Sequence, residues 1–278
     1  MSRNPYHIEN QLPTLKMSVF AFMDILGYTK IIQDAVATGK QQDILRSLYV
    51  ALTKGRDWLE DKDLSHEFKE QMGKDDYALK AFTDNIVIGW PTYKDGEGEL
   101  GAAFLKLQYF QLQMVLNGFF IRGALSVNDA YIDEIAVFGT ALIEAHEGES
   151  NLAHFPRIIL MPSAVNTTKM HMEYHGGPKF AKIQEVLRDS DGQWFINYLG
   201  CLVSEDFEGE IFHLIMDHKK MVGSKLSEFR NQPAIWPKYV WVARYHNYFC
   251  ELHKDVCDSN CKIDDKLYAQ NPSLIVSE

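Results

Sequence analysis

The sequence contains no apolar run long enough to cross a membrane. A membrane-spanning helix needs roughly 18 consecutive apolar residues, and no stretch of this chain approaches that length. Residues 1–7 also lack the apolar segment of a secretory signal. We therefore expect a cytoplasmic protein with no membrane partner.

Basic residues are scarce as well. The chain has 28 Lys and Arg residues against 38 Asp and Glu residues, which gives a net charge of −10. Proteins that bind a nucleic-acid backbone present a basic surface to the phosphates. The charge therefore argues against a nucleic-acid partner, whereas a small polyanion held through metal ions remains compatible with it.

Cysteine is scarce too, with four residues in the chain. In a reducing cytoplasm these residues are expected to remain thiols. Cys250, Cys257 and Cys261 cluster with His246 and His253 near the C-terminus. One interpretation is a structural zinc site; the other is a helix followed by a polar tail, and no Cys-x-x-Cys pair is present to favour zinc.

The hydrophobic pattern predicts an α+β fold. An apolar fraction of 46% and a charged fraction of 24% are ordinary for a globular domain. The order β-α-α-β-β-α-β predicts one sheet with helices on one face. We expect this sheet domain over residues 1–200, with a C-terminal helical extension packed on it over residues 201–278. Strands are predicted at 16–24, 77–82, 86–90, 119–127, 157–161 and 194–199, and helices at 28–38, 41–59, 100–116, 139–149, 211–229 and 235–253.

Several connections are also predicted. Asn128-Asp129 is a turn signal after the strand at 119–127. Pro162 is placed to open a helix at its first position. Residues 60–76 are expected to form an exposed connection, and residues 176–178 to interrupt the chain after that helix.

Two aspartates stand where core packing does not require them. Asp24 ends an apolar strand, and Asp84 lies at the tip of the predicted hairpin. The two carboxylates could meet at the same edge of a sheet. A few carboxylates, together with nucleotide phosphates, suffice to hold Mg²⁺. The pair predicts a metal-dependent nucleotide enzyme; the simpler interpretations are a helix N-cap for Asp24 and a turn residue for Asp84.

Four segments between residues 16 and 165 resemble, in order, those of the class III nucleotide cyclases. They are Phe-Met-Asp-Ile-Leu-Gly-Tyr-Thr at 22–29, Thr-Asp-Asn at 83–85, and the segments 121–127 and 137–142. The chain is similar, more closely, to the pyrimidine cyclases of bacterial Pycsar anti-phage systems. That similarity lies in segments 122–127, 138–147, 155–158 and 238–247.

The resemblance implies a fold, a reaction and partners. The implied fold is a ferredoxin-like (palm) mixed sheet. The implied reaction converts UTP into 3′,5′-cyclic UMP and pyrophosphate during phage infection, with CTP and cyclic CMP as the alternative. The cyclic nucleotide would activate a separate effector protein that the enzyme does not contact. Active sites would form at the interface of a head-to-tail homodimer. Aromatic residues of the C-terminal helices could reinforce the dimer or pack within the protein: Tyr239, Trp241, Tyr245, Tyr248 and Phe249.

The resemblance also assigns candidate site residues. Asp24 and Asp84 would bind two divalent metals, Mn²⁺ or Mg²⁺, with the carbonyl of Ile25 as a further ligand. Backbone N–H groups at the start of the next helix could bind the terminal phosphates; they belong to Leu26, Gly27, Tyr28 and Thr29.

Four further side chains are candidates for contacting the nucleotide. Arg122 is a candidate catalytic phosphate contact, and Lys80 or Arg46 could serve in its place. Tyr49, on the helix at 41–59, is the candidate for contacting the pyrimidine. The alternatives are a strand-surface arginine for Arg122 and a surface or core tyrosine for Tyr49.

The chain departs from the purine cyclases at positions that read the base or stabilise the transition state. Ala78 and Ala136 stand where adenylate cyclases carry a base-reading lysine and aspartate, and alanine can neither donate nor accept a hydrogen bond through its side chain. Ile143 and Glu147 replace the asparagine and arginine that stabilise the transition state. The first pair argues against an adenylate or guanylate cyclase. The second leaves open a catalytically inactive, nucleotide-binding signalling protein. A diguanylate cyclase or palm-type polymerase is disfavoured by the acidic charge and the absence of a Gly-Gly-(Asp/Glu)-Glu-Phe segment.

Overall fold

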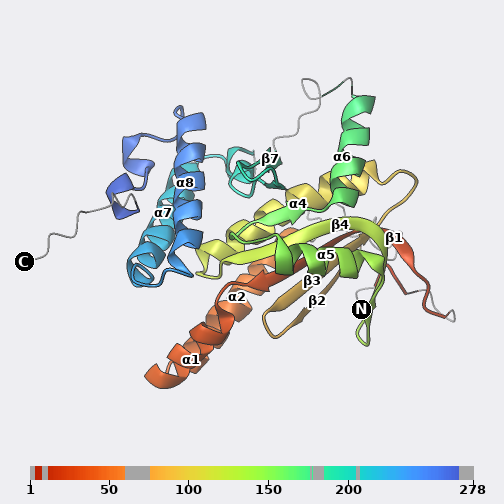
Figure 1. The fold of residues 1–278 in the computed structure, drawn as a ribbon, viewed down its shortest axis with the longest axis horizontal. Helices are drawn as coiled ribbons and strands as arrows, with labels where there is room; N and C mark the ends of the chain where they lie inside the picture. Colours follow the sequence, from red (N-terminus) through yellow and green to blue (C-terminus); the bar gives the residue numbers. More distant parts are fainter. Residues whose placement is uncertain are drawn as a thin grey trace, which may run out of the picture. The chain divides into compact units, whose positions relative to one another are not determined.

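The computed structural model of the chain describes residues 4–7, 12–59, 76–175, 177, 185–204 and 207–268 (Figure 1). These residues belong to two compact units, Met1–Cys201 and Leu202–Glu278. The predicted connection at 60–76 and the predicted break at 176–178 lie almost entirely outside the described residues. Within the described part of the chain, every helix is too short or too polar to cross a lipid bilayer.

The first unit is built on one eight-stranded sheet. Its strands run in the order β2-β3-β1-β4-β6-β8-β7, with β5 paired to β4, and only the β4–β6 pair is parallel. The segment order β1-α-β2-β3-α-β4, with β1 and β3 in the centre, is the ferredoxin-like arrangement. The predicted α+β class is therefore confirmed. The strands are β1 (Lys16–Ile25), β2 (Ala78–Phe82), β3 (Asn85–Pro91), β4 (Ile121–Ile132), β5 (Val137–Phe138), β6 (Ile158–Leu160), β7 (Val186–Arg188) and β8 (Trp194–Ile196).

Helices cover both faces of this sheet, which corrects the prediction of helices on one face. Alternate residues of β1 point to opposite faces: Val19, Ala21 and Met23 belong to one apolar core, and Phe20 and Phe22 to another. The first core includes residues of α2 and α4, and the second includes residues of α5 (Figure 1). The helices of this unit are α1 (Tyr28–Thr38), α2 (Gln41–Leu59), α4 (Glu97–Leu116), α5 (Thr140–Asn151) and α6 (Pro162–Tyr174).

The sheet differs from the prediction at several places. The predicted turn at Asn128-Asp129 is wrong, because both residues continue β4 and pair with β1 opposite Ser18 and Met17. Asn128 also donates a 2.6 Å hydrogen bond to Glu144 of α5. Strands β5 and β7 were not predicted, and β8 ends three residues before the predicted strand does. Pro162 does open α6, as expected.

The second unit contains two helices that follow each other in the sequence, together with short 3₁₀ turns. Both predicted helices are confirmed, and they pack on each other. Of the predicted interface aromatics, Tyr239, Tyr245 and Phe249 are buried, whereas Tyr248 is half exposed. Their part in a dimer stays a prediction. The elements are α7 (Ile211–Glu228), α8 (Trp236–Leu252), η3 (Ser259–Cys261) and η4 (Asp265–Leu267), and η1 (Gly200–Val203) spans the boundary between the units.

The cysteine cluster of this unit is buried. Cys250, Cys257 and Cys261 are free thiols, and burial raises the pKa of each. They therefore do not belong to a polar tail. In the described part of the chain, no three or more His, Cys, Asp or Glu side chains are arranged to hold a metal ion, so the zinc interpretation gains no support.

A buried histidine pair lies beside these thiols. The rings of His218 and His246 are stacked, with their Nδ1 atoms 2.9 Å apart. His246 Nε2 is 2.8 Å from the carbonyl of Cys261, which can only accept, so His246 carries its proton on Nε2. His218 must then donate from Nδ1. A second proton on His246 would lie on Nδ1, where it would face the Nδ1–H group of His218. Burial accordingly lowers the pKa of both rings, that of His246 to about 4.

This pair predicts a loss of stability in acid. An unfolded histidine binds a proton near pH 6.5, whereas folded His246 resists it until about pH 4. The unfolded state therefore binds more protons, and the free energy of unfolding should fall by about 3 kcal/mol as the pH drops through that window. Urea denaturation at pH 7 and pH 4 measures this fall. The His218→Leu/His246→Leu double variant should show a flatter pH dependence, and a control variant of exposed His213, His213→Gln, should keep the full dependence. Equal slopes in all three proteins would contradict the assignment.

Candidate active site

The structure brings the ends of β1 and of the β2–β3 hairpin together. Asp24 pairs with Asn85 in the β1–β3 register, and the amide of Ile25 donates a 3.0 Å hydrogen bond to the carbonyl of Asp84. Two residues, Thr83 and Asp84, connect the hairpin strands. The two predicted aspartates therefore lie at one edge of the sheet, and the charge of Asp84 reaches Asp24 strongly enough to raise its pKa.

Neither simpler interpretation of the aspartates accounts fully for them. Gly27, not Asp24, occupies the N-cap of α1, and it makes no side-chain cap. Asp84 does order its turn, because its Oδ1 accepts hydrogen bonds from Thr83 Oγ1 at 2.9 Å and Asn85 Nδ2 at 3.2 Å. Its Oδ2 makes no hydrogen bond with the described residues. Asp24 Oδ1 is likewise unbonded there, whereas its Oδ2 accepts from Arg122.

Arg122 holds Asp24 and a second carboxylate. It lies directly opposite Asp24 in the β1–β4 register. Its Nε is 3.2 Å from Asp24 Oδ2, and its Nη2 is 2.7 Å from Glu149 Oε1. Its Nη1 lies 3.5 Å from the carbonyl of Ala153. Arg122 therefore lies in the same cluster of charges as Asp24, and its part in a reaction stays a prediction.

Glu149 is the site residue that sequence analysis missed. It lies on the buried face of α5 with Ala141, Ala145 and Gly148, and its side chain is only 7% exposed. Charged side chains are rarely buried unless they are paired. The available signal was the spacing: Ala141, Ala145 and Glu149 recur every four residues, which puts an acid on a stripe of small residues facing the sheet.

The pKa of Asp24 is raised to about 6. Burial is the largest cause, because it disfavours the charged form. The charges of Glu149 and Asp84 act in the same direction, and Arg122 opposes them. Three carboxylates thus share this edge of the sheet with one guanidinium group.

The N-terminus of α1 lies immediately after Asp24. The amide of Leu26 donates a 2.8 Å hydrogen bond to the carbonyl of Phe120, so the prediction that it binds phosphate is not supported. Gly27 has a φ of 73°, the left-handed conformation that glycine adopts at little cost. The first amides of the helix, at Tyr28 and Thr29, have no side-chain cap.

The remaining predicted residues lie outside this cluster of charges. Lys80 donates to the carbonyls of Asp133 and Glu134, at 3.2 and 3.0 Å, which occupies its ammonium group. Tyr49 is 70% exposed on α2, so it is not a core tyrosine. Ile143 and Glu147 are exposed on the outer face of α5. Their roles, and that of Tyr49, stay predictions.

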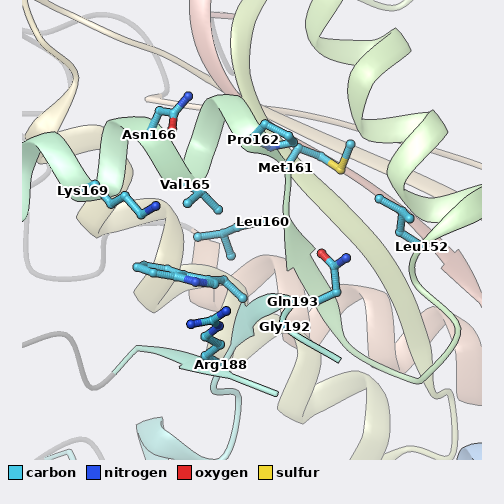
Figure 2. A pocket seen from close by; sticks show the side chains of 11 residues that line it. Leu152, Leu160, Met161, Pro162, Val165, Asn166, Lys169, Arg188, Gly192 and Gln193 are labelled. Carbon is cyan, nitrogen blue, oxygen red and sulfur yellow. The ribbon is translucent and has the colours of Figure 1, made fainter. Parts of the chain in front are cut away.

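A pocket of about 470 Å³ lies elsewhere on the first unit, between α6 and strands β6 to β8 (Figure 2). Leu160 and Val165 contribute apolar walls, and Lys169 and Arg188 contribute positive charge. The ammonium group of Lys169 lies 5.8 Å from the ring of Trp194. The predicted site residues do not line this pocket, so it is separate from the carboxylate cluster.

Comparison with known proteins gives a fold likeness alone. No protein-family model matches the sequence, and no curated protein matches it. Two solved structures are similar at a TM-score of 0.42. One is a class III adenylyl cyclase-like ATP-binding protein from Pseudomonas aeruginosa, with 14% identity over 64% of this chain and 42% of that chain. The other is the guanylyl cyclase Cya2, with 10% identity over 66% of this chain and 93% of that chain. This chain thus spans less than half the length of the first, and at these scores the likeness carries no argument about function.

Proposed function

We propose that the protein is a metal-dependent nucleotide cyclase whose substrate is a pyrimidine nucleoside triphosphate, UTP with CTP as the alternative. One observation carries the proposal. The two aspartates of the cyclase-like segments meet at one sheet edge, beside the uncapped N-terminus of α1. The ordered resemblance of the four sequence segments supplies the reaction class.

The residues at this edge fit a divalent cation in kind. Mg²⁺ and Mn²⁺ prefer oxygen ligands and usually take few carboxylates, because substrate phosphates and water complete the shell. Asp24 and Asp84 each keep one carboxylate oxygen free of hydrogen bonds from the described residues. The carbonyl of Ile25, at the end of β1, would be the third protein ligand. Bound cations would lower the pKa of the ribose 3′-hydroxyl and neutralise phosphate charge.

The reaction itself is an internal displacement. The ribose 3′-oxygen forms a bond to the α-phosphorus, the bond from that phosphorus to the bridging oxygen breaks, and pyrophosphate leaves; the hydroxyl proton passes to solvent. The amides of Tyr28 and Thr29 would bind the terminal phosphates at the positive end of α1. Arg122 is ion-paired with Asp24 and would contact the phosphates.

Exposed side chains are the structural support for the pyrimidine preference and the homodimer. Tyr49 is exposed and can contact a small base, in this protomer or in a second one. Phe138 of β5 and Ile143 of α5 are exposed apolar side chains that a second protomer could cover. We include in the proposal a cytoplasmic role in anti-phage defence through a separate effector protein. That role rests on the sequence resemblance.

Incubation with each of the four nucleoside triphosphates tests the proposal. With Mn²⁺ present, we expect cyclic UMP and pyrophosphate from UTP, or cyclic CMP from CTP, and no cyclic purine nucleotide. Chromatography of the reaction mixtures identifies the products. All four nucleotides returned unchanged, with either Mn²⁺ or Mg²⁺, would overturn the proposed activity.

A second candidate is a nucleotide-binding signalling protein without turnover. Glu147 stands where purine cyclases carry the transition-state arginine, and its exposed carboxylate cannot serve that purpose. This candidate predicts metal-dependent nucleotide binding with no product. Calorimetric titration of UTP, run beside the product assay, separates the two candidates.

A further inference from the structure

Arg122 occupies the carboxylate that the proposed cations need. Its Nε lies 3.2 Å from Asp24 Oδ2, so a cation that takes both Asp24 oxygens must displace it. We infer that Arg122 is an internal counter-ion of the metal-free protein and that Glu149 is the positioning residue that retains Arg122 when a divalent cation binds Asp24. This inference rests on the proposed function, because it assumes a metal at Asp24.

The charges explain why a counter-ion is needed. Asp24, Asp84 and Glu149 contribute three negative charges and Arg122 one positive charge, a formal sum of −2. The side chains of Asp24 and Glu149 are 18% and 7% exposed, so solvent screens their repulsion poorly. Without Arg122 the unpaired carboxylates would destabilise this edge of the sheet. A divalent cation could replace that positive charge.

The geometry indicates where Arg122 remains. Its contact with Glu149 is the shorter of its two ion pairs, 2.7 Å against 3.2 Å, and Glu149 is the more buried partner, although this contact lacks the alignment of a hydrogen bond, which the contact with Asp24 has. Its Nη1 also lies 3.5 Å from the carbonyl of Ala153. When a cation at Asp24 repels the guanidinium group, only the longer contact needs to break. Glu149 then keeps Arg122 at the edge of the site, with Nε free for a substrate phosphate.

Glu149 and Arg122 should therefore affect metal affinity in opposite directions. Arg122→Met removes the competing cation, so Mn²⁺ should bind about tenfold more tightly. Glu149→Gln removes the retaining charge and leaves Asp24 as the only carboxylate paired with Arg122, so Mn²⁺ should bind about tenfold more weakly. The electron paramagnetic resonance signal of free Mn²⁺, titrated without nucleotide, measures both affinities. A purely structural ion pair would move neither.

A double variant protects the test against misfolding. Arg122→Met alone leaves Glu149 buried without its partner and could lower the melting temperature. Arg122→Met/Glu149→Gln removes both charges, so it should melt near the wild type and still bind Mn²⁺ more tightly than the wild type. Lys106→Met, which removes a cation paired with Asp76 elsewhere in this unit, is the matched control and should leave Mn²⁺ affinity unchanged.

Different results would overturn the proposed metal site and the proposed roles of Arg122 and Glu149. If Asp24→Asn does not weaken Mn²⁺ binding, the metal site of the proposed function is wrong. If Asp24→Asn does weaken it while Arg122→Met and the double variant bind Mn²⁺ no more tightly than the wild type, the counter-ion role of Arg122 is wrong. An unchanged affinity in Glu149→Gln would overturn the role given to Glu149.

Discussion

Replacing Asp24 with asparagine is expected to lower the rate of cyclic-nucleotide formation by about a hundred- to a thousand-fold. The amide keeps the shape of the side chain and can still accept from Arg122 through its oxygen, but it loses the negative charge that would hold a divalent cation. Asp84→Asn should cost a similar factor, because its amide oxygen can still order the turn with Thr83. Chromatographic measurement of cyclic nucleotide at fixed protein concentration gives both factors.

A nearby aspartate supplies the control for this experiment. Asp34 lies on α1, and its exposed carboxylate pairs with Lys30 alone among the described residues. Asp34→Asn changes the net charge by the same amount as the two site variants and should leave the rate unchanged within twofold, because exposed ion pairs contribute little. Full activity in Asp24→Asn would exclude the carboxylate as a metal ligand. An equal loss in Asp34→Asn would show that the effect is not specific to the site.

Replacing Gly148 with valine is expected to produce a large loss of stability. A Cβ atom at this position would lie 2.7 Å from the Cβ of Ala124 and would overlap the sulfur of Met161. The methionine end can move, but the Ala124 Cβ is fixed to β4, so α5 must shift away from the sheet. Overpacking of this kind costs about 3 kcal/mol, which corresponds to a fall of about 10 °C in melting temperature for a protein of this size.

The shift should also reach the site, because Glu149 is the next residue. Movement of α5 would separate Glu149 from Arg122, so Gly148→Val should reduce activity even at temperatures where it remains folded. Gly101 of α4 is the matched control, since a Cβ there meets no atom within 4 Å. Gly101→Val should change the free energy of unfolding by less than about 0.5 kcal/mol. If both variants melt at the wild-type temperature, α5 does not pack as closely as the structure places it.

The local pattern of the sequence was enough to predict the central elements. The helices at 28–38 and 41–59 have the predicted bounds, because their apolar spacing, the glycines beside them and the turn between them agree. The run Val-Phe-Ala-Phe-Met was correctly assigned to a strand. Its lack of alternation also indicated burial on both faces, and the prediction of helices on one face overlooked that indication.

The errors arose where pairing or packing at a distance overrides local preference. Asn128 and Asp129 favour turns, but the partner strand β1 holds both in the ladder. Strand β7 has three residues and too little pattern to be recognised. The placement of Asp24 and Asp84 at one edge of the sheet was predictable, because one ends an apolar strand and the other lies at a hairpin tip. Glu149 could not be predicted from the sequence, because its contact with Arg122 arises only when α5 packs on the sheet.

The hairpin that carries Asp84 leaves no room for a change in its length. Thr83 and Asp84 are its whole connection, and the amide of Ile25 fastens the carbonyl of Asp84 to the end of β1. Side chains along a strand alternate between faces, so inserting or deleting a single residue here would turn the second carboxylate away from the first. Point substitutions can change the charge at this edge of the sheet. A related protein that keeps the proposed reaction should, in contrast, keep the length of the hairpin.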